Sequence, residues 1–242
     1  MKWLRTLVLF DKGDVISSLD WQRLHESYVR SITSIDFPEG TGSLTLRRKI
    51  RDPDGQWRRN GVNYLRSRFL NHIIEQEQWE AEGLVELARD RDQPPIRLYP
   101  SLELYREPVT SDFGGFDFVS TGSGGLRIAI EWETGNISSS HRSMNKLSIA
   151  LANGVIDIGV LILPSRSLYE HLTDRIGNIS ELSGYLAMWE GLKATVERGL
   201  LAITVVEQDH LTDREEFPYL PRGNDGRAKE GRAKTGRIKT TR

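Results

Sequence analysis

The sequence predicts an α/β fold in which a mixed β-sheet is flanked by helices. After residue 112, apolar stretches of strand length alternate with amphipathic helices in the order β-β-α-β-α-α-β. The stretch 155–163, VIDIGVLIL, is nearly continuously apolar, which is typical of a central strand buried on both faces. The glycine-rich stretch 121–125, TGSGG, indicates a hairpin between two short strands.

Each element is predicted from its apolar spacing and its boundary residues. In the first half we expect a strand at 3–10, a helix at 19–30, a loop at 38–43, a helix from 62 toward 79 that ends near 83, and a proline-rich break at 92–100. In the second half we expect strands at 114–120 and 126–133, a helix at 141–153 capped by Ser140, a strand at 155–163, a helix at 181–199 and a last strand at 200–208.

Composition excludes several classes of protein. No run of eighteen apolar residues occurs, so no membrane span is expected. The N-terminal stretch MKWLRTLVLF lacks a cleavage site and is interpreted as a strand rather than a signal peptide. The absence of cysteine excludes disulfides and thiolate metal sites, and a cytoplasmic location is expected.

The net charge of −1 conceals a strong segregation of charge. Segments 47–68 and 222–242 each hold eight basic and two acidic residues, so the remainder of the chain carries −13. Such segregation favours a polyanionic ligand, although two solvated basic faces are the ordinary alternative. We expect one domain over 1–220 and a basic, disordered tail at 221–242, which either adds nonspecific affinity for nucleic acid or serves only solubility.

Two glutamates end the strand at 126–133. Because side chains alternate along a strand, Glu131 and Glu133 share a face with Ala129, about 7 Å apart. If the hairpin turn centres near Ser123, Asp117 faces Ala129 and lies diagonal to Glu131, about 7 to 8 Å away. Three carboxylates around one point suit Mg²⁺, with Asp117 and Glu131 as ligands. A metal-activated water could then attack a phosphodiester. The alternative for any one carboxylate is a solvated strand end.

An aspartate, a strand and then Glu-x-Glu resembles the PD-(D/E)xK nucleases, and the glutamate variant resembles type II restriction endonucleases of the BamHI and BglII kind. Further resemblance lies in EWETGN, in LTDRIGN, and in the blocks RRNGVNYLRSRFLNHIIEQEQWEAEG and DRIGNISELSGYLAMWEG, covering most of residues 57–192 but not the tail. It implies a restriction-endonuclease-like core at about 100–206.

The resemblance also implies roles for individual residues. Asp117, Glu131 and Glu133 would be catalytic, and Glu133 stands where many relatives have lysine. Its role as general base is a hypothesis, and a base provided by the phosphate itself is the rival. A further acid is often present in the family, for which Glu82 and Glu103 are candidates. The residues expected to contact DNA are Asn136, Ser140, His141, Arg142, Asp174 and Arg175. Arginine pairs with guanine and aspartate accepts from cytosine, so the Asp174–Arg175 pair could read one G·C pair.

The function predicted is a Mg²⁺-dependent type II restriction endonuclease that cleaves double-stranded DNA at a short palindrome. Mn²⁺ is expected to substitute for Mg²⁺. A palindrome implies a homodimer, the family resemblance suggests a GATC-containing site, and a restriction enzyme implies a cognate DNA methyltransferase in the host. A catalytically silent DNA-binding protein of the same fold and a nuclease acting on RNA are the alternatives. No P-loop, nucleophile elbow or zinc motif occurs.

Overall fold

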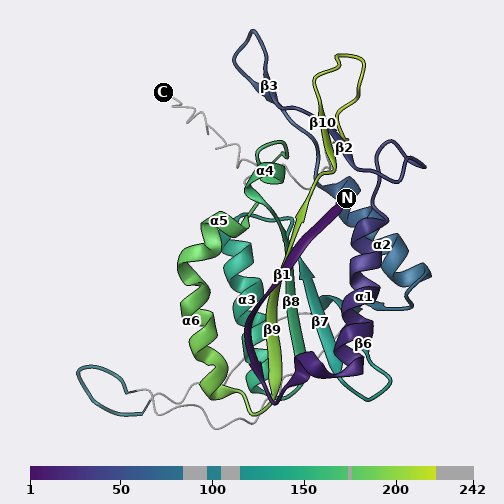
Figure 1. Cartoon of the computed structure of the whole chain (residues 1–242). Helices are drawn as coiled ribbons and strands as arrows, with labels where there is room; N and C mark the ends of the chain where they lie inside the picture. Colours follow the sequence, from purple (N-terminus) through teal and green to yellow (C-terminus); the bar gives the residue numbers. More distant parts are fainter. Residues whose placement is uncertain (84–96, 105–114, 174–175, 222–242) are drawn as a thin grey trace, which may run out of the picture.

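The computed structural model describes residues 1–83, 97–104, 115–173 and 176–221. Its centre is a six-stranded mixed sheet in the order β1-β9-β8-β7-β6-β5 (Figure 1). Strands β7, β8 and β9 are parallel, and the remaining pairs are antiparallel. The strands are β1 (Lys2–Lys12), β5 (Glu80–Gly83), β6 (Phe116–Thr121), β7 (Arg127–Trp132), β8 (Ile158–Pro164) and β9 (Gly199–Glu207). Every residue of β8 is buried, which confirms the prediction of a central strand.

Helices cover both faces of the sheet and divide the core into two clusters (Figure 1). On one face α1 (Leu19–Thr33) and α2 (Asn63–Glu75) pack against the even-numbered apolar residues of β7. On the other lie α3 (Ile137–Ala152), α5 (Ile179–Leu182) and α6 (Leu186–Gly191). The short helix α4 (Arg166–Tyr169) follows β8, and 3₁₀ turns span Val15–Ser17, Ser183–Tyr185 and Leu192–Thr195. The predicted α/β class with a mixed sheet is confirmed.

Two small ribbons extend the fold beyond the main sheet. Strand β10 (His210–Thr212) pairs in parallel with β2 (Thr45–Arg47). Strand β3 (Ile50–Arg51) pairs in antiparallel fashion with β4 (Trp57–Arg58). Within the part of the chain that the structure describes, no helix combines the length and apolar character needed to cross a membrane.

The β6–β7 register differs from the prediction by two residues. Val119, not Asp117, lies opposite Ala129, and Phe118 lies opposite Ile130. The turn therefore centres on Gly124 rather than on Ser123. A shift of two leaves every side chain on its predicted face. The shift places Asp117 opposite Glu131, just beyond the last paired residues Phe118 and Ile130, instead of diagonal to it.

An aspartate on α1 sets this turn. The Gly124 amide donates to both carboxylate oxygens of Asp20, at 2.9 and 2.8 Å, and the Leu126 amide donates to Oδ2 at 3.3 Å. A Cβ at Gly122 would lie 2.6 Å from the Asp20 carboxyl carbon, so only glycine permits this close approach. The register thus depends on a contact between residues more than a hundred positions apart, which hairpin rules alone do not contain.

Three predicted helices have different bounds. The helix predicted from 62 toward 79 spans only Asn63–Glu75; Gln78 beyond it has a left-handed φ of 59°, and the chain continues as strand β5. The helix predicted at 141–153 begins four residues earlier, capped by Asn136 rather than Ser140. The helix predicted at 181–199 is divided into short α and 3₁₀ segments, in keeping with the low helix propensity of Gly184 and Gly191. Its predicted inward stripe nevertheless packs into the core: Leu182, Leu186, Trp189, Leu192 and Val196.

The tail predicted at 221–242 lies outside the described residues except for Pro221, and most of the proline-rich break at 92–100 lies outside them as well.

Candidate active site

The predicted carboxylates lie close together where β6 begins and β7 ends. Asp117 is the second residue of β6, Glu131 lies near the end of β7, and Glu133 follows β7. The Trp132 amide donates to Asp117 Oδ2 at 2.9 Å, which joins the two strands at this point. Alternation along β7 confirms the predicted faces, because Ile130 packs in one core cluster and Ala129 in the other.

A lysine that the sequence did not reveal completes the surroundings of Glu131. Lys146 Nζ, from α3, lies 2.7 Å from Glu131 Oε1 and donates to the Gly115 carbonyl at 2.5 Å. The same nitrogen lies 4.3 Å from the centroid of the Phe116 ring. Burial raises the pKa of Glu131, and the bond from Lys146 opposes that shift. The spacing Glu133-x12-Lys146 on a predicted amphipathic helix was the only available signal, and it is not specific.

Asp117 is paired with an arginine of α2. Arg66 Nη2 lies 2.8 Å from Asp117 Oδ1 and 3.4 Å from Glu82 Oε1. Glu82 on β5 therefore shares a cation with Asp117, and its side chain is 73% exposed. Glu103 makes no contact with these residues among the hydrogen bonds and ion pairs of the described chain. Of the two candidates for a further acid, Glu82 is the one that lies at the site.

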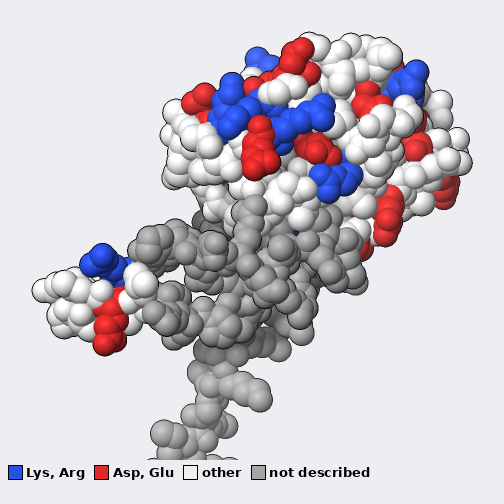
Figure 2. All heavy atoms as spheres, turned by 90° about the horizontal axis from the view of Figure 1, so that it is seen from below, with Lys and Arg blue, Asp and Glu red and all other residues white. Residues whose placement is uncertain are grey.

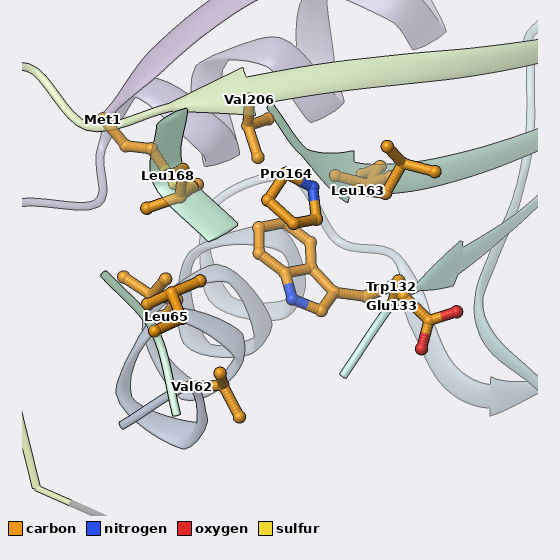
Figure 3. Close-up of a pocket in the computed structure, with 11 residues that line it drawn as sticks. Met1, Val62, Leu65, Trp132, Glu133, Leu163, Pro164, Leu168 and Val206 are labelled. Carbon is orange, nitrogen blue, oxygen red and sulfur yellow. The ribbon is translucent and has the colours of Figure 1, made fainter. Parts of the chain in front are cut away.

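Glu133 turns toward the start of α3. Its Oε2 accepts from Ser140 Oγ at 2.5 Å, and its Oε1 accepts from the Gly135 amide at 2.6 Å. Burial raises the pKa of Glu133 to about 7, against the lowering effect of these two bonds. In Figure 3 the Trp132 ring points into an apolar pocket that also holds Leu65, while the Glu133 carboxylate points away from that ring. The pocket belongs to the core behind the carboxylates.

The residues expected to contact DNA take different positions around the first turn of α3. Asn136 is exposed, and its side-chain oxygen accepts from the Ser138 and Ser139 amides, so it caps the helix. Ser140 is completely buried, so its side chain is not available to DNA in this structure. The His141 ring lies against Tyr185, with centroids 4.3 Å apart. Arg142 is exposed and makes no salt bridge within the described ranges.

Asp174 and Arg175 lie outside the described residues, but their neighbours on both sides are placed. Ile176 forms a β-bridge with Asn136, and the Gly177 amide donates to the Gly135 carbonyl at 3.2 Å. A Cβ at Gly177 would collide with Ser140 Oγ, so glycine permits this close approach. Ile176 and Gly177, which follow the predicted pair in the sequence, therefore lie beside the N-terminus of α3.

Two carboxylates of this site fit a magnesium ion. No group of three or more acidic or histidine side chains within the described ranges is arranged to hold a metal. Asp117 and Glu131 supply a pair of hard oxygen ligands, and Mg²⁺ commonly takes one or two carboxylates and completes its shell with water and substrate phosphate. The charge of Asp117 raises the pKa of Glu131, a repulsion that a cation would relieve.

Comparison with known proteins places the chain in a family. The model of the family described as "Restriction endonuclease BamHI" matches residues 1–227. The type II restriction enzyme OkrAI of Oceanobacter kriegii is 32% identical over 198 residues, which cover 82% of this chain and 85% of that protein. The type II restriction enzyme BamHI of Bacillus amyloliquefaciens is 38% identical over 103 residues, or 43% and 44% of the two chains.

Among solved structures, a BglII restriction endonuclease complexed with a DNA 16-mer aligns with a TM-score of 0.48 and 10% identity, over 91% of this chain and 88% of that one. The family match over residues 1–227 and the relative matched over 82% of this chain carry the assignment without it. The chain belongs to the BamHI restriction endonuclease family, and it is a type II site-specific endonuclease with a restriction-endonuclease-like α/β fold.

Proposed function

We propose that this endonuclease depends on Mg²⁺ and hydrolyses double-stranded DNA at a short palindrome that contains GATC. The observation that carries the metal dependence is the juxtaposition of Asp117 and Glu131 on neighbouring strands, beside the N-terminus of α3. Bound there, Mg²⁺ would lower the pKa of a water molecule and stabilise the charge that develops on the phosphate. Mn²⁺, which also takes oxygen ligands, should replace it.

The protein's own side chains would prepare this site. Asp117 and Glu131 bind the ion, and Lys146 limits the repulsion between the carboxylates by neutralising Glu131. Glu133 is oriented by Ser140 and Gly135 and is the proposed general base, with the DNA phosphate itself as the rival base. Glu82 is the proposed further acid, because it reaches Asp117 through Arg66.

Recognition is proposed for the residues around the start of α3. Asn136 and Arg142 are exposed there, and Ile176, which follows Asp174 and Arg175 in the sequence, forms a β-bridge with Asn136. Arginine and aspartate side chains can read G·C pairs in the major groove. His141 and the backbone near Ser140 would add further contacts to the DNA. Reading a palindrome requires two copies, so we propose a homodimer in the cytoplasm, with a DNA methyltransferase protecting the host.

One digestion tests this function. Phage DNA is incubated with Mg²⁺ and one of three proteins: the wild type, Glu131→Ala or Glu190→Gln. Glu190 is an exposed acid on α6 and serves as the control position. We expect discrete fragments from the wild type and Glu190→Gln only, and sequenced ends that share one palindrome. Asymmetric cut sites would overturn the homodimer. Intact DNA with Mg²⁺ and with Mn²⁺, together with retained DNA binding, would instead favour a silent DNA-binding protein. Cleavage of competing RNA alone would establish a ribonuclease.

A further inference from the structure

A short basic ribbon projects from the end of the sheet. Residues 47–59 carry six basic and two acidic side chains. Strands β3 and β4 are exposed throughout, and in Figure 1 β3 and its following loop extend beyond the ends of β8 and β9. Arg51 donates to the Gly55 carbonyl at 3.1 Å, and Arg58 to Asp52 at 2.7 Å, which close the ribbon. Two strands of this length bury no core of their own, so stability alone does not account for the ribbon.

Part of its positive charge has no carboxylate partner. Within the described part of the chain, Arg47 and Arg51 donate only to backbone carbonyls. The Nε atom of Arg59 is buried and has no hydrogen-bond partner there. Burial and the charges of Lys49, Arg48 and Arg59 lower the pKa of neighbouring His171, which reflects the positive potential at this place. The remaining cations, Arg48, Lys49 and Arg58, form pairs that are at least partly open to solvent, so these pairs contribute little and can exchange for another anion.

The base of the ribbon and the start of α3 pair with residues that are close together in the sequence, between His171 and Ile176. Asn60 directly follows the ribbon. Its backbone amide donates to the His171 carbonyl at 2.9 Å, and its backbone carbonyl accepts from the Thr173 amide at 2.6 Å. Three residues further on, Ile176 pairs with Asn136 at the start of α3. Three residues span at most about 11 Å of extended chain. With about 5 Å for each of the two backbone pairings, the base of the ribbon lies within about 21 Å of the helix that borders the carboxylates. This is roughly two thirds of a B-DNA turn of about 34 Å.

The opposite end of the molecule has a different charge pattern. Figure 2 views that end, and the Lys and Arg side chains visible there stand beside Asp and Glu side chains. Lys193 and Arg198, which are exposed in the turn before β9, belong to the end where β9 begins. The ribbon's positive charge therefore lies at the end of the sheet that holds the candidate site, opposite to Lys193 and Arg198.

We propose that the β3–β4 ribbon is a DNA-binding arm that holds backbone phosphates of the duplex beside the cleaved site, without reading bases. This proposal rests on the proposed action on double-stranded DNA. Arg51 and Arg58 are the arm's outer cations, and Arg59 and Lys49 flank the Trp57 ring at 5.7 and 5.6 Å from its centroid. Phosphate contacts of this kind set affinity and orientation rather than sequence choice.

The test is the salt dependence of binding. Fluorescence anisotropy of a labelled 30-base-pair duplex, without divalent ions, compares the full-length wild type with Arg51→Gln/Arg58→Gln between 50 and 200 mM salt. Each lost phosphate contact lowers the slope of log K against log salt by about 0.9, so we expect a change of about 2 for each protomer bound. Lys193→Gln/Arg198→Gln removes the same charge at the far end and should keep the wild-type slope. Arg51→Gln alone breaks no ion pair and should give about half of the change.

The outcomes separate the arm from the function. An unchanged slope for both ribbon variants, with a wild type that still cleaves DNA at discrete sites, would overturn the arm and leave the nuclease intact. An equal change of the salt slope in Lys193→Gln/Arg198→Gln would also overturn the arm, because the slope would then depend only on the net charge of the protein. If the wild type neither binds nor cuts duplex DNA, the proposed function and the arm fail together. Circular dichroism of each variant confirms that the fold is kept.

Discussion

Lys146 Nζ and Glu131 Oε1 lie 2.7 Å apart, and their side chains are only 9% and 12% exposed. The pair joins α3 to β7, so it fixes the helix that carries the proposed recognition residues to the strand that carries Glu131. A buried pair contributes little net stability when intact, but removal of one partner leaves an uncompensated charge.

Lys146→Met should therefore destabilise the protein by about 3 kcal/mol, because Glu131 would remain buried without its cation. Urea denaturation monitored by circular dichroism measures this change. Adding Glu131→Gln should recover part of the loss, since no charge is then buried alone. The control Lys193→Met, at an exposed position, should stay within about 0.5 kcal/mol of the wild type. A Lys146→Met protein as stable as that control would contradict the structural role of the pair.

Glu131→Gln and Asp117→Asn should each weaken Mg²⁺ binding, because an amide oxygen carries no net charge for the ion. Isothermal titration calorimetry of the full chain should show at least about a tenfold loss of affinity, which corresponds to about 1.4 kcal/mol. Glu190→Gln, in an exposed acid of α6, serves as the matched control. Wild-type Mg²⁺ affinity in both site variants would exclude this pair as the metal ligands.

Asn136 has two separable roles, a helix cap that the structure shows and a DNA contact that we propose. Asn136→Ala should cost about 1 kcal/mol of stability, whereas Asn136→Ser should keep most of it because serine also caps helices. If the side-chain amide also contacts DNA, both variants should lose cleavage at the target site. A serine variant with wild-type cleavage and wild-type stability would show that Asn136 acts only as a cap.

Asp20 should make stability depend on pH through the hairpin turn. The bond from the Gly124 amide is the main cause that lowers the pKa of Asp20, so the carboxylate stabilises the fold above its unfolded pKa. This contribution is lost as pH falls through the lower, folded pKa. Asp20→Asn should cost about 1 to 3 kcal/mol at pH 7 and progressively less in acid. Urea titrations at a series of pH values measure it, with exposed Asp213→Asn as control. A cost that does not depend on pH would contradict the ionic role.

Local pattern determined much of the fold. Alternation along residues 126–133 correctly assigned Ile130 and Ala129 to opposite faces, and the apolar run of β8 correctly predicted the central strand. The inward stripe from Leu182 to Val196 was also correct, although the continuous helix predicted for it was wrong. These features follow from backbone geometry within a few residues, which a single sequence contains.

The sequence by itself determined which acidic residues lie at a strand end, namely Asp117, Glu131 and Glu133, and it carried the family signature. Only the tertiary structure decided what those carboxylates contact. Lys146 reaches Glu131 from fifteen residues away, Arg66 reaches Asp117 from fifty-one, and Asp20 sets the hairpin register from α1. Each of these contacts joins separate elements, so it depends on how helices pack on the sheet. The alternation of side chains along an element shows on which face a residue lies. It does not show which residue of another element packs against it.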